Sequence, residues 1–255
     1  TPVSDFIDSV KALPDSVADE AYARRARDFS NLGAMDQVAT RKTLKVYSAL
    51  RARAENEGLA GIAVRCWPEF FTQYGCAACG AIALMNEDRR PGGCEADMFG
   101  VISSLLLQWS SDQGVFNTDL VDIDPVSDTM VFWHCGQAPI EMADPDVSPQ
   151  ATIHSNRKLP LLSEFPLKPG RITLCRITQG GGKLRMMLAG GDMLKAPLAY
   201  SGTSGVARLD VHADIFRQRL LDAGMEHHCS LAYGDHRPVL RQIARILDLE
   251  LIELA

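Results

Sequence analysis

The sequence predicts an α/β fold in which a partial Rossmann-like α/β domain, residues 1–111, is followed by a mainly β domain, residues 112–255. In the first part, segments with helical periodicity flank one short apolar run at residues 59–67, as in a β–α arrangement of Rossmann type. From about Val115 onward the pattern changes to short runs of apolar, β-branched and aromatic residues, which are typical of strands. These two patterns predict the fold class.

Helices are predicted over residues 16–29, 37–57 and 96–109. The second of these carries an apolar stripe at the spacing of one buried helix face, formed by Val38, Leu44, Tyr47, Leu50 and Ala54. The chain opens directly in helices, without the first strand of a doubly wound sheet. We therefore expect the N-terminal part either to contact another polypeptide extensively or to contain a sheet of unusually few strands.

The C-terminal part alternates strand and helix patterns with turn signals between them. Strands are predicted at residues 115–121, 129–133, 171–178, 183–188, 229–233 and 249–254, and helices at residues 210–222 and 238–247. The glycines at 180–182 indicate a hairpin turn. Residues 144–169 are rich in Pro, Asp and Ser, so they are predicted to form a surface loop.

The composition argues against several classes of protein. The chain of 255 residues has a net charge of −6 and scattered basic residues, which argues against a nucleic-acid partner. Its longest apolar run spans about seven residues, whereas about 20 are needed to cross a bilayer, so no membrane partner is expected. The seven cysteines lie mostly in apolar segments and no signal peptide is evident, which predicts reduced thiols and a cytoplasmic protein.

Three acidic side chains are candidates for binding a metal ion. Glu95 and Asp97 follow a Pro-Gly-Gly turn at the start of a predicted helix, where carboxylates are also favoured simply by the unpaired N–H groups of the first turn. Asp119 lies in an apolar strand pattern, and a buried carboxylate there needs a cation or hydrogen-bond donors. Asp122 and Asp124 alternate as on a solvated strand face, so we interpret them as structural.

Histidines supply the nitrogen ligands for such a site. His227 and His228 enter a predicted strand as neighbours, so their rings are expected on opposite faces, with only one of them in a given site. His134 stands at the end of another predicted strand. Each of these histidines can equally be a core residue that satisfies an ordinary hydrogen bond. Two carboxylates with one imidazole suit Mn²⁺ or Mg²⁺ better than zinc, whose structural sites favour thiolates and several histidines.

The Cys76-Ala-Ala-Cys79 motif suggests a zinc or redox site only weakly. Neither a second Cys-x-x-Cys pair nor a nearby histidine completes a zinc site, and the flanking residues are apolar. We therefore expect Cys76 and Cys79 to be free thiols in apolar surroundings.

Several short motifs together resemble shorter members of the L-fucose isomerase family. They occur in this order: Cys66-Trp67-Pro68-Glu69; Cys94-Glu95-Ala96-Asp97-x-x-Gly100; His134-Cys135-Gly136; Lys168-Pro169-Gly170-Arg171-Ile172-Thr173-Leu174-x-Arg176; and His227-His228-x-x-Leu231-x-Tyr233-Gly234-Asp235. The resemblance extends from about residue 40 to the end of the chain, and the order and spacing of the motifs together carry it.

The resemblance implies a set of metal ligands. In this family a Glu, an Asp and a His bind a divalent metal, and they match Glu95, Asp119 and His228 here. Glu95 and Asp119 would also serve as the catalytic base and acid. The ion would be Mn²⁺, or another divalent cation such as Mg²⁺ or Co²⁺.

The resemblance further implies an aldose–ketose isomerase that acts on a free sugar through an ene-diol. Moving a hydrogen between C1 and C2 needs a Lewis acid on the sugar oxygens, together with a base and an acid for the protons. Trp67, His134 and His227 would contact the sugar. His134 is also the nearest counterpart of a second ligand histidine in L-arabinose isomerases, which look similar.

Residues 1–111 would then be the second half of the family's Rossmann-like middle domain, and residues 112–255 its mainly β, barrel-like C-terminal domain. Because relatives assemble as oligomers, we expect a homo-oligomer, or a partner chain that carries the missing N-terminal domain. Two other interpretations stay open: a non-catalytic or partner-dependent sugar-binding subunit of the same fold, and a metal-dependent aldolase. Activity of the isolated chain tests the first alternative, and the carbon count of the product tests the second.

Overall fold

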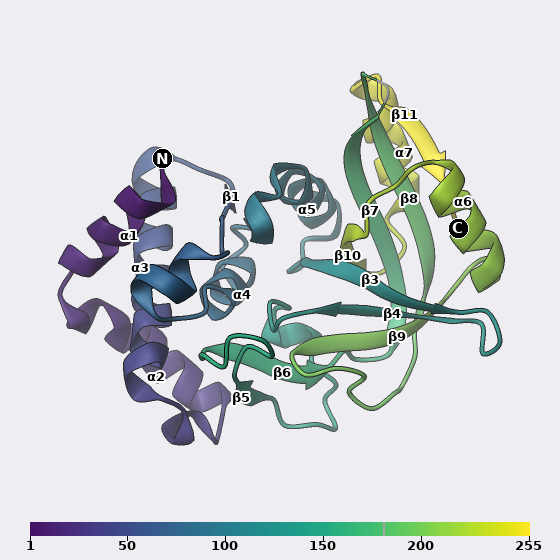
Figure 1. The fold of residues 1–255 in the computed structure, drawn as a ribbon. Helices are drawn as coiled ribbons and strands as arrows, with labels where there is room; N and C mark the ends of the chain where they lie inside the picture. Colours follow the sequence, from purple (N-terminus) through teal and green to yellow (C-terminus); the bar gives the residue numbers. More distant parts are fainter. Residues whose placement is uncertain (181) are drawn as a thin grey trace.

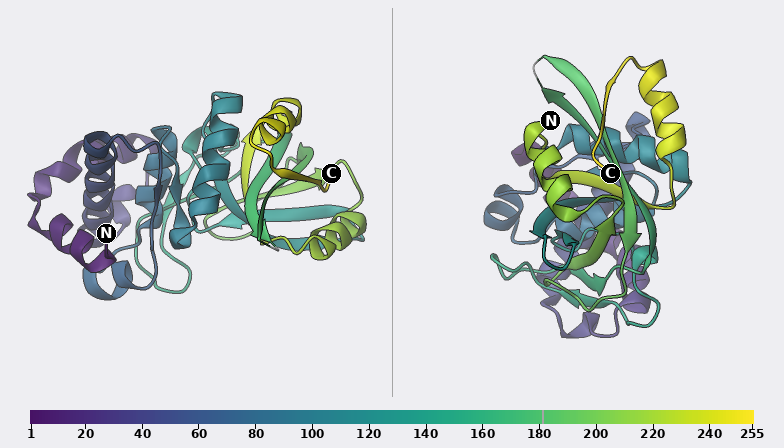
Figure 2. Two further views of the ribbon diagram at one scale, coloured as in Figure 1. Left: turned by 90° about the horizontal axis from the view of Figure 1, so that it is seen from above. Right: turned by 90° about the vertical axis from the view of Figure 1, so that its right-hand side faces the viewer.

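The computed structural model describes residues 1–180 and 182–255, and it places a helical N-terminal part beside a β-barrel (Figure 1). Seen from above, the N-terminal helices occupy one side of the molecule and the barrel the other, and the two chain ends lie far apart (Figure 2). The helix α5 (Met98–Ser111) lies at the junction, because it contacts β1 and β2 of the first part and β7 and β10 of the barrel.

The helical part is built from elements whose ends follow ordinary capping rules. Its other helices are α1 (Val3–Ala12), α2 (Asp19–Asp28), α3 (Gln37–Glu57) and α4 (Cys79–Glu87). At the start of α3 the Asp36 side chain accepts the N–H groups of Val38 and Ala39, and the helix ends at Gly58 in the left-handed conformation. Among the described residues, every helix is too short or too polar to span a bilayer.

The Rossmann-like arrangement predicted for residues 1–111 is not confirmed. Its parallel sheet consists of β1 (Ile62–Ala63) and β2 (Gly92–Gly93), so the predicted strand at 59–67 shrinks to two residues. Val64 and Cys66 of this run are buried in the core around α3, against helices instead of neighbouring strands. An apolar run in the sequence can therefore be buried without belonging to a sheet. The two-stranded sheet agrees with the expectation of unusually few strands.

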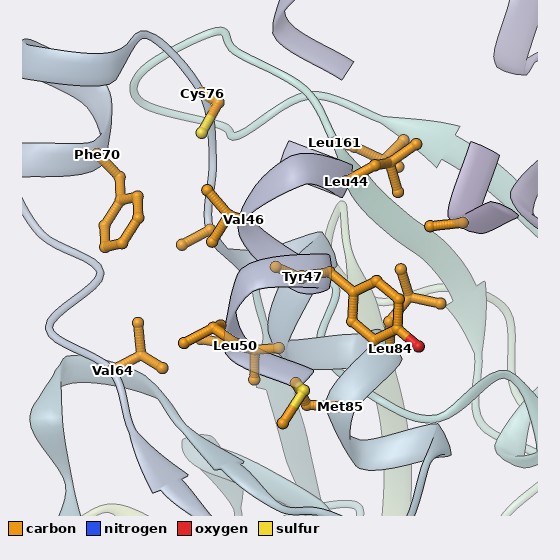
Figure 3. Close-up of a cluster of buried hydrophobic side chains, with 14 of the residues drawn as sticks. Leu44, Val46, Tyr47, Leu50, Val64, Phe70, Cys76, Leu84, Met85 and Leu161 are labelled. Atoms are coloured by element: carbon orange, nitrogen blue, oxygen red, sulfur yellow. The ribbon is translucent and has the colours of Figure 1, made fainter. Parts of the chain in front are cut away.

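The core of the helical part includes a residue from a distant segment. Figure 3 shows Leu161 beside Leu44 of α3, in a cluster completed by Val46, Tyr47, Leu50, Val64, Phe70, Cys76, Leu84 and Met85. The same segment docks through its backbone, because the N–H of Gly80 donates to the Leu161 carbonyl oxygen at 2.9 Å. A Cβ at Gly80 would come within 2.4 Å of that oxygen, so this helix position admits only glycine.

Six antiparallel strands close into a barrel in the C-terminal part, which confirms the mainly β, barrel-like prediction. The strand order is β8-β7-β10-β3-β4-β9, and an antiparallel pairing of β9 with β8 completes the ring. The bounds are β3 (Phe116–Asp124), β4 (Thr129–His134), β7 (Gly170–Gly180), β8 (Lys183–Met193), β9 (Thr203–Leu209) and β10 (His228–Tyr233). Helices α6 (Ala213–Asp222) and α7 (Arg237–Ile246) and the strand β11 (Glu250–Glu253), parallel to β8, lie outside this ring.

Two parts of the barrel depart from the sequence prediction. The predicted loop 144–169 contains β5 (Gln150–Thr152) and β6 (Leu162–Pro166), and β9 was not predicted at all. β6 contains Ser and Pro and β9 contains Ser and Gly, so their strand patterns are weak. They form because neighbouring strands supply the pairing; β6, for instance, pairs at the edge of β9. Gly181 of the predicted hairpin turn lies outside the described residues, while β7 and β8 pair as far as Gly180 opposite Lys183.

We expect Leu161→Ala to lower the free energy of unfolding by about 2–5 kcal/mol, because it removes a fully buried side chain from the core of the helical part. Leu184→Ala is the matched control, since Leu184 is 48% exposed, and it should change the free energy of unfolding by less than about 0.5 kcal/mol. Urea unfolding measures both. Equal effects of the two substitutions would mean that the 160–161 segment does not stabilise the helical part.

Candidate metal centre and its cavity

The register of two barrel strands brings Asp119 and His228 together. β10 and β3 are antiparallel, and His228 lies directly opposite Asp119 in their register. Side chains of directly opposed residues project from the same face of a sheet, so this pairing alone places the carboxylate beside the imidazole. Nε2 of His228 lies 3.0 Å from Oδ1 of Asp119.

Glu95 reaches the same point from the junction between the helical part and the barrel. It lies in the short turn Cys94–Ala96, and both Glu95 (φ 57°) and Ala96 (φ 60°) adopt the left-handed conformation. Residues other than glycine rarely adopt this conformation, which costs of order 1–3 kcal/mol per residue and is concentrated at functional sites. Oε2 of Glu95 lies 3.8 Å from Nε2 of His228, and the Glu95 side chain is 58% exposed.

Three buried polar atoms at this point form no well-aligned hydrogen bond in the described part of the chain, although two of them lie 3.0 Å apart. They are Oδ1 of Asp119, Nε2 of His134 and Nε2 of His228. These residues can place one ligand atom each within 4.8 Å of one another. Buried polar atoms are nearly always satisfied, so a convergent group of unsatisfied oxygen and nitrogen atoms fits a cation or a polar ligand.

The two buried histidines are oriented differently. Nδ1 of His134 accepts the backbone N–H of Cys135 at 2.9 Å, so in the neutral ring Nε2 carries the proton. That nitrogen, 3.8 Å from Oδ1 of Asp119, is therefore a donor and not a metal ligand. Nδ1 of His228 instead lies 2.9 Å from Oδ2 of Asp97, and when it donates to Asp97 the lone pair of Nε2 faces Asp119 and Glu95.

Asp97 holds this arrangement in place. Its carboxylate accepts the N–H of Gly100 at 2.8 Å, which caps α5, and it also pairs with the Arg176 guanidinium and with His228. The expected first-turn role is therefore correct, but it is not the whole role. Burial alone would raise the pKa of Asp97; His228, Arg176 and the Gly100 N–H together hold that pKa well below its usual value.

The sequence analysis did not single out Arg176 as a site residue. It lies in β7 with its side chain 6% exposed, and it bridges Asp97 to Glu226, whose Oε1 lies 3.4 Å from the guanidinium. An arginine inside a strand as apolar as β7 was the available signal, because a buried guanidinium needs paired carboxylates.

Burial lowers the pKa of His228, but Asp119 and Asp97 outweigh it and raise that pKa to about 10.

The expectation that only one ring of the His227–His228 pair can face the site is wrong. Nε2 of His227 lies 3.9 Å from the same Asp119 oxygen that faces His228, and the His227 side chain is 65% exposed. The strand β10 begins at His228, so His227 precedes it and does not follow the alternation of strand side chains. His227 therefore stands at the solvent side of the site.

A cavity of about 560 Å³ opens beside this site. Its walls include the predicted residues Trp67, Glu95, Asp119 and His134, together with Arg65, Ala96, Trp133, Cys135, His154, Ser155 and Asn156. Trp67 packs edge-on against Phe71, and the guanidinium of Arg157 lies 3.9 Å from the centre of the Trp67 ring. A larger cavity of about 710 Å³ lies beside α1, but none of the three unsatisfied atoms belongs to its walls.

Comparison with known proteins gives matches over nearly the whole chain. Residues 132–255 match the family model described as L-fucose isomerase, C-terminal domain. The chain is 31% identical over 246 residues to a sulfoquinovose isomerase of Priestia aryabhattai, covering 96% of this chain and 55% of that protein. It is 30% identical over 220 residues to one of Alkalicoccus urumqiensis, covering 86% and 50% of the two chains. The chain spans about half the length of the curated relatives it matches.

The raised pKa of His228 predicts a pH dependence of stability in the metal-free chain. Because this pKa is about 10 in the folded state and 6.5 ordinarily, the protonated ring stabilises the fold fully below pH 6.5, and this contribution is lost as the pH rises towards 10. We expect the difference in free energy of unfolding between the chain and His228→Gln, both in EDTA, to shrink from pH 6 to pH 10. A constant difference in urea unfolding over this range would show that the ring is not protonated at neutral pH.

Proposed function

The chain belongs to the L-fucose isomerase family, and on this basis we propose that it carries the catalytic half of a metal-dependent aldose–ketose isomerase. The observation that carries the proposal is the convergence of Asp119 and His228, both with an unsatisfied buried atom in the described part of the chain, next to the strained Glu95. Strained backbone and unsatisfied polar atoms are both costly to the fold, and both are typical of a functional site.

The substrate that we propose is sulfoquinovose or a related sulfonate-bearing aldose. The relatives named above are described as sulfoquinovose isomerases. The cavity offers matching charge, since Arg65 forms part of its wall and the guanidinium of Arg157 lies against the ring of Trp67, another wall residue. Guanidinium groups suit a sulfonate because they present several N–H donors in one plane.

Glu95, Asp119 and His228 would hold the divalent cation, with Mn²⁺ as the first choice and Mg²⁺ or Co²⁺ as alternatives. Two carboxylates and one neutral imidazole form an oxygen-rich set, which suits these ions. The bound ion would act as a Lewis acid on the carbonyl and the adjacent hydroxyl of the sugar. Asp97 would keep His228 in the tautomer whose Nε2 is free to bind.

The proton transfers fall to the carboxylates of the chain. Glu95 and Asp119 would act as the base and acid pair that moves the proton between C1 and C2 through an ene-diol. His134 presents its Nε2–H to the cavity, so it would donate a hydrogen bond to a sugar oxygen or to Asp119. Trp67 and the exposed His227 would contact the rest of the sugar.

A partner-dependent subunit is the second candidate, and a specific observation favours it. The Glu95 and His227 side chains are 58% and 65% exposed, so the site is open on its solvent side, where a second polypeptide or a further copy of this chain would complete the cavity. This candidate keeps the same metal centre and differs only in what completes the cavity. It would bind metal and sugar without converting the sugar.

We expect the purified chain with Mn²⁺ to convert sulfoquinovose to a ketose of the same carbon count, with solvent deuterium incorporated at the carbon that changes. Asp119→Asn should lower kcat by about 10²–10⁴-fold, because it removes a group that transfers protons. Asp122→Asn is the matched control, since Asp122 lies exposed on the same strand, and it should leave kcat unchanged.

Other outcomes of this assay separate the rival functions. Metal-dependent sugar binding without turnover would favour the partner-dependent subunit, and adding the missing partner should then restore turnover. Shorter products would identify an aldolase. If the correctly folded chain neither binds nor converts sulfoquinovose, the proposal that this sugar is the substrate of the site is wrong.

Asp97→Asn should weaken Mn²⁺ binding by about 10–100-fold, because an amide no longer fixes the charge and orientation of His228. Calorimetric titration of the EDTA-stripped chain with Mn²⁺ measures the change, and Asp122→Asn again serves as the control. An unchanged Mn²⁺ affinity would mean that His228 is not a ligand or that Asp97 does not orient it.

A further inference from the structure

Four buried thiols lie beside the candidate metal centre in one cluster of two close pairs, which Cys94 and Cys135 join by contacting each other. Sγ of Cys79 lies 3.3 Å from Sγ of Cys135, and Sγ of Cys66 lies 2.9 Å from Sγ of Cys94. The cysteines of each pair lie far apart in the sequence, so the fold and not local spacing brings them together. In the described part of the chain all cysteines are free.

The pair formed by Cys79 and Cys135 differs from every other thiol in its access. Cys135 forms part of the wall of the cavity that contains Glu95 and Asp119, whereas Cys79, Cys66 and Cys94 do not. The Cys135 sulfur also has polar neighbours, since Nδ1 of His134 lies 3.3 Å and Nε2 of Gln137 lies 3.7 Å away. Cys135 is therefore the thiol of this cluster that lies nearest to a small molecule in the cavity.

We propose that Cys79 and Cys135 form a reversible dithiol–disulfide site, which a small hydroperoxide oxidises through the cavity. The Cys135 sulfur attacks one oxygen of hydrogen peroxide; the O–O bond breaks, and Cys135 becomes a sulfenic acid as one water leaves. The Cys79 sulfur then attacks the Cys135 sulfur, and the S–S bond forms as a second water leaves. Two electrons pass from the two sulfurs to the peroxide, and both thiol protons end in water.

The geometry of the pair suits this step. A disulfide needs its sulfurs about 2.05 Å apart, so the gap of 3.3 Å must close by little more than an ångström. The backbone N–H and the sulfur of Cys135 both contact Nδ1 of His134. Closing the disulfide therefore moves a neighbour of His134 and should disturb the cavity wall.

A metal ion on these thiols is the main alternative. Cys79, Cys135 and His154 can bring one ligand atom each within 4.8 Å of one another. However, Nδ1 of His154 accepts the backbone N–H groups of Asn156 and Arg157, both at 3.3 Å. Nε2 of the neutral ring then carries the proton, so neither ring nitrogen has a free lone pair for an ion. This favours the disulfide.

The first test is chemical and does not depend on the proposed function. Treatment of the whole chain with a modest excess of hydrogen peroxide should remove two of its seven thiols, as counted after denaturation, and dithiothreitol should restore them. Peptide mapping should find Cys79 linked to Cys135. Cys94 also lies against the Cys135 thiol, so the variant that leaves Cys135 without a partner thiol is Cys79→Ala/Cys94→Ala. In that double variant Cys135 should advance to the sulfinic acid, which dithiothreitol does not reverse.

Cys175→Ala is the matched control, because Cys175 is equally buried but lies in the barrel, in a different core cluster from Cys79 and Cys135; it should behave as the unmodified chain does. A disulfide between Cys66 and Cys94, unchanged thiols after peroxide, or stoichiometric zinc that is lost in Cys79→Ala would each overturn the proposal.

The second test rests on the proposed function. If the chain isomerises the sugar, peroxide should lower that activity by at least about tenfold, and dithiothreitol should restore it in the unmodified chain but not in Cys79→Ala/Cys94→Ala. Activity that survives formation of the mapped disulfide would overturn the link to the metal centre. A chain without any isomerase activity would contradict the proposed function and leave the result of the mapping unaffected.

Discussion

One carboxylate, that of Asp97, joins the two parts of the molecule at the candidate metal centre. It caps α5, which belongs to the junction, and it pairs with His228 and Arg176, which belong to the barrel. A buried carboxylate with fewer donors would cost free energy. The start of α5 and the strands β7 and β10 must therefore lie next to one another, because each supplies a donor to this carboxylate. The position of the imidazole then follows from the same contacts that fix the docking of α5.

The candidate metal centre combines two side chains that strand register positions with one side chain from a strained turn. Asp119 and His228 are set by the register of two strands, which cannot slip without moving every side chain to the other face of the sheet. Glu95 is set by a left-handed turn that is costly by itself and is held by backbone bonds, such as that from the Ala96 N–H to the Val64 carbonyl oxygen. Asp119 and His228 therefore define where the centre lies, and the turn presents the exposed carboxylate of Glu95 to the cavity.

Local signals predicted local structure, and tertiary contacts account for what was missed. α3 has the bounds that the sequence predicts because Asp36 and Gly58 are capping residues in themselves. β9 and the pair β5–β6 have weak strand patterns and form only because neighbouring strands offer edges. At the site, Asp119 could be suspected from the cost of a buried carboxylate. The bridge from Asp97 to Arg176 could not, because it joins residues 79 positions apart.

The closed ring of the barrel has a consequence for how this chain can be divided. The recognisable family domain covers residues 132–255, but β3 (Phe116–Asp124) precedes it and separates β10 from β4 in the ring. A fragment cut at residue 132 would leave both of those strands with unpaired edges, and such edges promote aggregation. It would also leave Leu161 without the helices that bury it. The unit that can be expressed alone is therefore larger than the family domain at residues 132–255, and it includes at least β3 and the helices that bury Leu161.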